Sequence, residues 1–213
     1  MGFGFGRSWG LLLVVMLFGI RAAASAGRKG TEIAVLVYDS VQIPLSVLDQ
    51  AERDAATIFR TAGVEVRWVN CSNGSALVDD SCHHVPGSNQ LVLHIVPRGK
   101  TSTDLVFGLS FLDEDGTGKY SDVFFDRIAD AGRAFGANPS RLLGAVAAHE
   151  LGHLLLGSHA HSGIGIMTPQ WEKQTLRSLN RGRLLFTPEQ ASRMQARIRR
   201  DDLGRARFPP GSE

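Results

Sequence analysis

The segment HELGHLLLGSHAHSGIGIM, residues 149–167, constrains this chain more than any other. His149 and His153 are four residues apart, so on an α-helix their side chains lie on one face, one turn apart. Two imidazoles placed in this way can reach one zinc ion, which prefers nitrogen and sulfur ligands in a tetrahedral arrangement. Glu150 points to the same side of the helix and can reach a metal-bound water, whose pKa zinc lowers to about 7. The segment therefore predicts a helix that carries a catalytic zinc site, with Glu150 as the general base.

Residues before and after the motif favour a helix over a chance occurrence of H-E-x-x-H. Asn138 is a typical N-cap residue, and Pro139 follows it at the first helical position, where proline is favoured. Gly157 stands where the helix should end and suits a left-handed C-terminal cap. Small residues would let this helix pack closely against a sheet: Gly144, Ala145, Ala147 and Ala148. We therefore expect the active-site helix at about 139–156.

The third zinc ligand has two candidates. A catalytic zinc site needs three protein ligands and one open position, and both His159 and His161 are available as the third. The segment resembles the metzincin zinc metallopeptidases, whose pattern is H-E-x-x-H-x-x-G-x-x-H followed by a Met-turn. His159 has the family spacing from His153, but the glycine comes one residue late, at position 157. The third residue after this glycine is Ala160, which lies between the two histidines, so the pattern leaves both candidates open.

A closer resemblance favours His161. The chain looks like a group of uncharacterised secreted bacterial metzincin-like proteins, which have HELGHLLLG, then HS, then GIM and a tryptophan. The matching residues here are His161-Ser162, Gly165-Ile166-Met167 and Trp171. The resemblance covers most of the chain after residue 26, and it implies that His161 is the third ligand and His159 a neighbour in the loop. It also implies that Met167 is the Met-turn methionine, which packs beneath the ligands without binding the metal.

The first 26 residues have the composition of a signal peptide. Arg7 gives a positive start, residues 11–20 are an apolar run, and Ala24-Ser25-Ala26 has the form of a cleavage site. The apolar run is too short for a stable membrane span, and an uncleaved anchor is the alternative. We therefore expect a secreted or periplasmic protein that has no contact with the membrane after cleavage.

Cleavage after Ala26 would leave 187 of the 213 residues, enough for one domain over residues 27–204 and a loose tail over 205–213. The full chain has a formal net charge of +2, and the removed segment holds Arg7 and Arg21 without any acidic residue. The exported part is therefore neutral, and nothing in it indicates a nucleic-acid partner. The sequence does not indicate an oligomeric state.

The two cysteines fit an exported protein. Cys71 and Cys82 flank a polar loop, SNGSALVDDS, between two expected strands. In an oxidising compartment such a pair is expected to form one local disulfide. The alternative is a zinc-binding or latency thiol, which two cysteines around a single loop do not favour.

Hydrophobic patterning predicts five strands and four helices. The strands are expected at 31–38, 64–69, 91–97, 105–112 and 121–126. The helices are expected at 44–62 and 139–156, with a third starting at Trp171 and a fourth starting with a capping box at Thr187 and Gln190. The first strand, helix and strand form a βαβ unit with a parallel pair. Together with the resemblance, this order predicts an α+β fold: an α/β-like N-terminal part with a twisted, mixed, five-stranded metzincin-like sheet, then the active-site helix, the Met-turn and C-terminal helices.

These features predict a secreted zinc-dependent metalloendopeptidase, which hydrolyses peptide bonds with a zinc-bound water activated by Glu150. By resemblance, residues 105–112 are the edge strand beside the cleft, and an extended peptide or protein substrate binds this edge through main-chain hydrogen bonds. One alternative is a zinc-stabilised module that binds peptides without cutting them. Another is a hydrolase of a non-protein amide.

An acidic turn is expected at residues 113–119, DEDGTGK. Acidic loops with glycine hold Ca²⁺ in related enzymes, but this loop lacks a complete calcium-binding pattern. Calcium is therefore a secondary expectation beside the single zinc ion.

Overall fold

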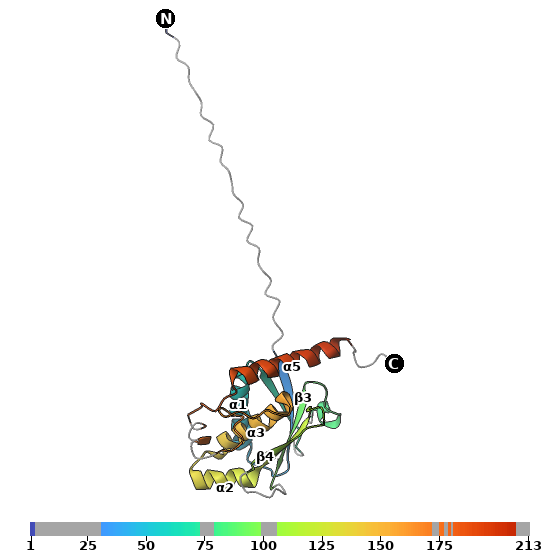
Figure 1. Cartoon of the computed structure of the whole chain (residues 1–213), viewed down its shortest axis with the longest axis vertical. Coiled ribbons are helices and arrows are strands. Elements are labelled where there is room, and N and C mark those ends of the chain that lie inside the picture. Colours follow the sequence, from blue (N-terminus) through green and yellow to red (C-terminus); the bar gives the residue numbers. More distant parts are fainter. Residues whose placement is uncertain are drawn as a thin grey trace.

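The computed structural model describes residues 1–2, 31–72, 79–98, 106–171, 175–176, 179 and 181–207 (Figure 1). The strands are β1 (Glu32–Asp39), β2 (Glu65–Asn70), β3 (Gln90–Val96), β4 (Gly108–Phe111) and β5 (Tyr120–Phe124). The helices are α1 (Leu45–Thr61), α2 (Phe125–Phe135), α3 (Pro139–Leu156) and α5 (Pro188–Arg207), with a short 3-10 turn at Asp80–His83. The signal peptide predicted for residues 1–26 lies outside the described residues, apart from the first two.

The five strands form one mixed sheet in the order β2-β1-β3-β5-β4. β1 pairs in parallel with β2 and with β3, and β3 pairs in parallel with β5. β4 is antiparallel to β5 and stands at the end of the order, which makes it an edge strand. The predicted α+β class and the parallel βαβ unit at the start of the chain are therefore confirmed.

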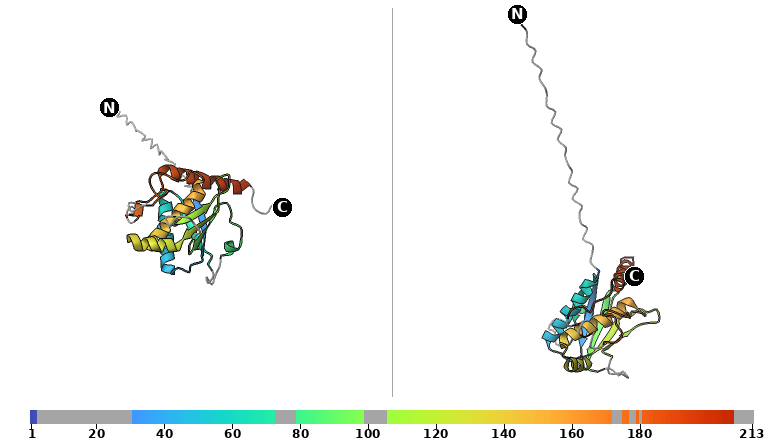
Figure 2. Two further views of the ribbon diagram at one scale, coloured as in Figure 1. Left: turned by 60° about the horizontal axis from the view of Figure 1, so that its bottom comes forward. Right: turned by 60° about the vertical axis from the view of Figure 1, so that its left-hand side comes forward.

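Helices α1 and α3 cover one face of the sheet (Figure 2). Side chains alternate along each strand, so on β1 the residues Ile33, Val35 and Val37 all point into the main core. Gly144 lets the two helices approach closely, since a Cβ there would lie 2.4 Å from the backbone oxygen of Ala51 in α1. Because α3 is buried around most of its circumference, its rotation is fixed, and so are the directions of its polar side chains.

A smaller cluster covers part of the opposite face. Cys71 and Cys82 form the disulfide expected from the sequence, with their Cα atoms 5.6 Å apart. The hydroxyl of Tyr38 donates to the backbone oxygen of Cys82 at 2.8 Å, and Leu36 and Val92 pack in the same cluster. The disulfide thus joins the end of β2 to the loop before β3, and it indicates an oxidising environment, extracellular or periplasmic.

The chain differs from expectation between β4 and α3. The strand expected at 105–112 is shorter, because β4 spans 108–111, and the strand expected at 121–126 ends at Phe124. Helix α2 follows β5 at once and was not expected. It is amphipathic, with Ile128 and Ala131 buried, but its N-cap residue, Phe124, makes no side-chain capping hydrogen bond. Because no capping side chain marks its start, this helix could not be predicted from a local signal.

Helix α5 begins with the predicted capping box. The backbone N–H of Thr187 donates to the Gln190 side-chain oxygen at 2.9 Å, and the Gln190 N–H donates to the Thr187 hydroxyl at 3.3 Å. The helix continues to Arg207, three residues into the segment expected to be a loose tail. The helix expected from Trp171 falls largely outside the described residues.

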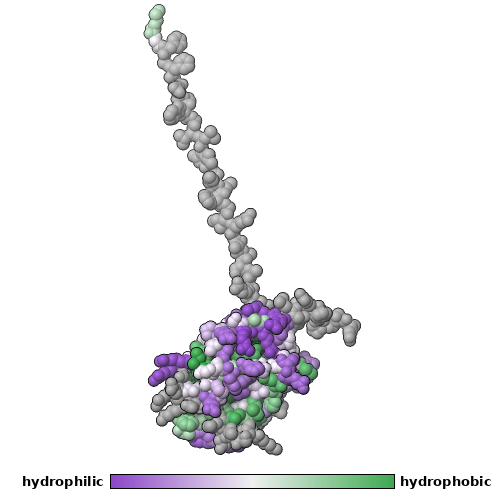
Figure 3. Space-filling view, in the orientation of Figure 1, coloured by the Kyte–Doolittle hydropathy of each residue, from purple (hydrophilic) through white to green (hydrophobic). Residues whose placement is uncertain are grey.

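Two features of the surface concern the wider setting. On the face drawn in Figure 3, hydrophilic residues are spread widely and hydrophobic residues form separate small areas. Of the helices that the structure describes, none has the length and apolar character needed to cross a membrane.

Candidate metal centre

Helix α3 brings His149 and His153 together. Its N-cap is Asn138, whose side chain accepts from the backbone N–H of Arg141 at 3.2 Å, and Pro139 is its first residue, as predicted. The Nε2 atoms of the two histidines lie 3.1 Å apart. Two ligands about 2.05 Å from a tetrahedral zinc ion would be about 3.3 Å apart, so the pair already has nearly the spacing that one ion requires.

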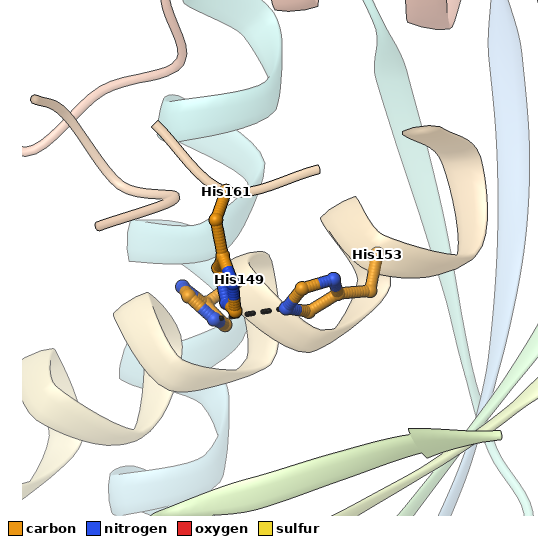
Figure 4. Close-up of side chains that lie close together, drawn as sticks. All are labelled: His149, His153 and His161. Carbon is orange, nitrogen blue, oxygen red and sulfur yellow. Dashed lines mark hydrogen bonds between the residues drawn. The ribbon is translucent and has the colours of Figure 1, made fainter. Parts of the chain in front are cut away.

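His161 completes the group. The chain leaves α3 at Gly157 with φ 77° and ψ −164°, so this glycine has a positive φ but not the left-handed helical cap that we expected. The loop that follows returns over the helix, and the three imidazoles point toward one another (Figure 4). The His161 ring lies 4.7 Å from that of His153 and 5.6 Å from that of His149. One ligand nitrogen from each histidine lies within 4.8 Å of the others.

His159 lies outside this group. It has a positive φ of 67°, which is uncommon for a residue other than glycine, and its side chain is exposed where it lines the cleft. The structure therefore gathers His161 and not His159 with the two helix histidines. Helix α3 ends one residue later than the family pattern implies, with its glycine at position 157. Because the helix is longer, the third histidine of the group also comes later in the chain, at position 161 and not 159.

A backbone carbonyl orients His149. Its Nδ1 lies 2.7 Å from the oxygen of Ile166, and a carbonyl oxygen can only accept, so Nδ1 carries the proton and Nε2 keeps its lone pair for a metal. The next residue, Met167, is fully buried, and its sulfur would lie 2.8 Å from a Cβ on Gly152 of α3. The turn at 165–167 thus packs directly beneath the histidine-bearing helix.

Burial keeps the helix histidines neutral. Desolvation lowers the pKa of His149 to about 4, with a smaller contribution in the same direction from His161 and an opposing one from the Ile166 carbonyl. Desolvation also lowers the pKa of His153 to about 3, with the charges of the other two histidines adding to it. At neutral pH both imidazoles are therefore unprotonated, as metal ligands must be. A donor set of three imidazoles fits zinc.

Glu150 lies in the same site, between α3 and the edge strand. Burial raises the pKa of its carboxyl to about 7, and a hydrogen bond from Ser110 opposes that rise. The Ser110 hydroxyl lies 2.7 Å from Oε2 and 2.8 Å from the backbone oxygen of Glu150. Gly108 makes room for the carboxyl group, since a Cβ there would lie 2.7 Å from Cγ and 2.8 Å from Oε1. Neither Ser110 nor Gly108 was predicted from the sequence; they lie two residues apart on one face of β4, and this alternation was the available signal.

These side chains line one cleft of about 470 Å³ between β4 and the loop after α3. Its far wall is aromatic: the Trp171 ring lies 5.7 Å from that of His149 and 6.3 Å from that of Phe107. The indole N–H of Trp171 donates to the backbone oxygen of Thr168 at 3.1 Å, which fixes the ring's orientation. The cleft therefore combines a polar floor with an apolar wall, as small-molecule and peptide sites commonly do.

Other candidate ligands lie elsewhere. His94 is on the opposite face of the sheet, with Nδ1 3.2 Å from a carboxylate oxygen of Asp122. In the expected acidic turn, the Asp115 carboxylate accepts from both the N–H and the hydroxyl of Thr117, so it stabilises the turn itself. Within the described ranges, no second group of three or more potential metal ligands was found.

The fold has a counterpart among solved structures. A zinc-dependent peptidase from Methanocorpusculum labreanum aligns over 76% of this chain and 99% of its own length, with 16% identity and a TM-score of 0.50. The chain shares the fold of that protein. An archaemetzincin from Methanopyrus kandleri aligns over 80% of this chain and 98% of its own length, with 14% identity and a TM-score of 0.49. No protein-family model and no curated protein matches the sequence.

Proposed function

We propose that the protein is a secreted zinc-dependent endopeptidase of the metzincin type. The observation that carries this proposal is the position of Glu150, which lies buried beside three converging histidines and against an edge strand that borders an open cleft. The fold that the chain shares with a solved zinc-dependent peptidase supports it. The resemblance of the segment at 149–171 to metzincins supports it independently.

Three residues would hold the metal. His149 and His153 would bind through Nε2, and His161 would be the third ligand, with His159 as a neighbour in the loop. A zinc ion held there supplies Lewis acidity, which acidifies a water molecule and polarises a substrate carbonyl. Met167 would serve as the Met-turn methionine, since it packs under α3 through the space left by Gly152.

Glu150 would act as the general base and then as the proton donor. Its carboxyl is held by Ser110 and shielded from bulk water, and its pKa of about 7 lies near the working pH, where a carboxylate can both accept and return a proton. It would take the proton from the attacking water and deliver it to the amide nitrogen that leaves. Atoms balance, because water adds across the C–N bond and gives a carboxyl group and an amine.

The substrate would bind as an extended strand along β4. As the edge of the sheet, β4 borders the cleft with Gly108, Leu109 and Ser110, and an edge strand offers unpaired backbone groups to a peptide. Main-chain hydrogen bonds would then give affinity with little demand on sequence. The apolar wall formed by Phe107 and Trp171 would contact one substrate side chain beside the metal.

A zinc-stabilised binding module explains the site less well. A structural zinc site is usually closed by a fourth protein ligand, whereas the group in the described part of the chain has three histidines. A module that only binds peptides would also have no use for a buried carboxyl beside the metal, because burying such a group without a role is unfavourable.

The decisive experiment compares cleavage of an unfolded protein mixture by the wild type and by Glu150→Gln. The variant keeps the size of the side chain and removes the base, so we expect zinc to be retained while turnover falls by roughly 10²- to 10⁴-fold. A chelator should abolish the wild-type activity. Full activity in Glu150→Gln would remove the proposed base, and no cleavage by a folded, zinc-loaded wild type would favour the binding module.

A further inference from the structure

A buried glutamine outside the three histidines bonds to both neighbours of His161. Gln190, near the start of α5, is 4% exposed. Its amide nitrogen donates to the backbone oxygen of Ala160 at 3.1 Å and to the hydroxyl of Ser162 at 3.0 Å. Its oxygen accepts from the N–H of Thr187 at 2.9 Å. Both N–H groups and the oxygen of this amide are therefore used, and both donors serve the loop that carries His161.

The loop needs such support because it has no regular structure of its own. Between Gly157 and Met167 the chain forms neither helix nor strand, and the His161 side chain is exposed. One backbone bond closes the loop, from the N–H of Ser162 to the oxygen of Met167 at 3.0 Å. Ala160 is buried at 2% exposure, so its carbonyl is out of reach of water and depends on Gln190.

A second residue of α5 holds the beginning of the same segment. The guanidinium of Arg193 donates to the backbone oxygen of Leu156, the last residue of α3, at 2.9 Å. Arg193 is three residues after Gln190 and therefore lies on the same side of the helix. The first two turns of α5 thus hold the segment from the end of the histidine-bearing helix to the third histidine.

We propose that Gln190 is a positioning residue for the third metal ligand, which makes the C-terminal helix part of the framework of the metal centre. The inference rests on the proposed metal site and adds a residue to it that touches neither metal nor substrate. An exposed histidine in an irregular loop would otherwise sample many orientations, and binding a metal would have to restrict them at a cost in affinity. The Gln190 amide removes that freedom before the metal binds.

The test is the zinc affinity of Gln190→Glu, measured by competition with a chromophoric chelator. The carboxylate can still accept from the N–H of Thr187, but it has no proton to donate to Ala160 or Ser162 when ionised. Loss of supporting bonds behind a metal ligand typically costs 10- to 100-fold in affinity, so we expect zinc to bind at least about tenfold more weakly.

The chain offers a matched control in the same helix. Gln195 also uses its amide nitrogen to bond a backbone carbonyl, that of Ala62 at 2.7 Å, but this contact anchors α5 to the end of α1. Gln195→Glu should therefore weaken the docking of α5 and leave the zinc affinity of the folded protein unchanged.

A double-mutant cycle separates positioning from general destabilisation. In a His161→Ala background, Gln190→Glu should cause no further loss of zinc affinity, because the ligand that it positions is gone. Ser162→Ala removes one acceptor at a half-buried site and serves if Gln190→Glu does not fold; we expect a roughly 2- to 10-fold loss.

Two results would overturn the inference while leaving the metal site intact. One is unchanged zinc affinity in both Gln190→Glu and Ser162→Ala. The other is a loss in Gln190→Glu that persists undiminished in the His161→Ala background. If the folded wild type binds no zinc at all, the proposed metal site fails and this inference fails with it.

Discussion

Gly108 offers the sharpest test of how the edge strand sets the position of the general base. A Cβ at this residue would lie 2.7 Å from the backbone oxygen of Asp122, 2.7 Å from Cγ of Glu150 and 2.8 Å from Oε1 of Glu150. Ordinary contacts between such atoms begin at about 3.5 Å. The methyl group of Gly108→Ala would therefore lie roughly 0.8 Å too close both to the Asp122 backbone oxygen and to the Glu150 side chain. Asp122 belongs to β5 and is held in the sheet, so the Glu150 side chain is the group that can move.

A displacement of this size predicts a large loss of turnover. Misplacing a catalytic group by about 1 Å can cost on the order of 10² in rate, so we expect kcat to fall about 100-fold in Gly108→Ala. Overpacking of this kind costs about 1–3 kcal/mol of stability, which a domain of ordinary stability survives. Zinc affinity should remain near that of the wild type, because the three atoms nearest to the added Cβ belong to Asp122 and Glu150 and to none of the three histidines.

The assay is turnover of a dye-labelled unfolded protein, with zinc content and urea unfolding measured on the same samples. Gly163→Ala is the control: it lies in the loop between His161 and Met167, and a Cβ there would meet nothing within 4 Å. In a Glu150→Gln background, Gly108→Ala should cause little further loss. Near-normal turnover in Gly108→Ala, or loss of zinc together with activity, would refute the reasoning.

Three further predictions concern the ligand set, the disulfide and a half-buried carboxyl in α1. His161→Ala should weaken zinc binding by more than about 100-fold and His159→Ala should hardly change it, and chelator competition showing the reverse order would move the ligand to His159. Reducing the Cys71–Cys82 disulfide should lower the free energy of unfolding by about 3 kcal/mol in urea titrations without releasing zinc, and metal loss on alkylation of the thiols would indicate a cysteine ligand instead. Burial, with a smaller contribution from the neighbouring carboxylate of Asp49, raises the pKa of Glu52 from 4.5 to about 7. The folded state therefore binds the Glu52 proton more tightly than the unfolded state does. The stability that this proton contributes is fully present below pH 4.5 and is lost as the pH rises through 7. Glu52→Gln should therefore be more stable than the wild type at pH 8.5, by about 1–2 kcal/mol after allowance for solvent screening, and the difference should vanish near pH 4.5; an equal difference at both pH values would contradict it.

The parts of the fold that the sequence predicted are those with local signals. Helix α3 has its N-cap at Asn138, its proline at the next residue and its glycine at the end, all within the segment itself. The capping box of α5 is similarly encoded by Thr187 and Gln190. Helix α2 was missed because it follows β5 without a break and without a capping side chain, so its periodicity merged with that of the strand.

The sequence alone determined the pair of helix histidines with the glutamate between them, because a spacing of four residues fixes their relation once the segment is helical. It also determined the candidates for the third histidine and for the disulfide. Only the tertiary structure decided that His161 joins the pair and that Ser110 and Gln190 support the site. Ser110 lies 40 residues from Glu150 along the chain, and Gln190 lies 30 residues from Ala160. Contacts over such separations depend on how β4 and α5 pack against α3, and no local pattern of residues records that packing.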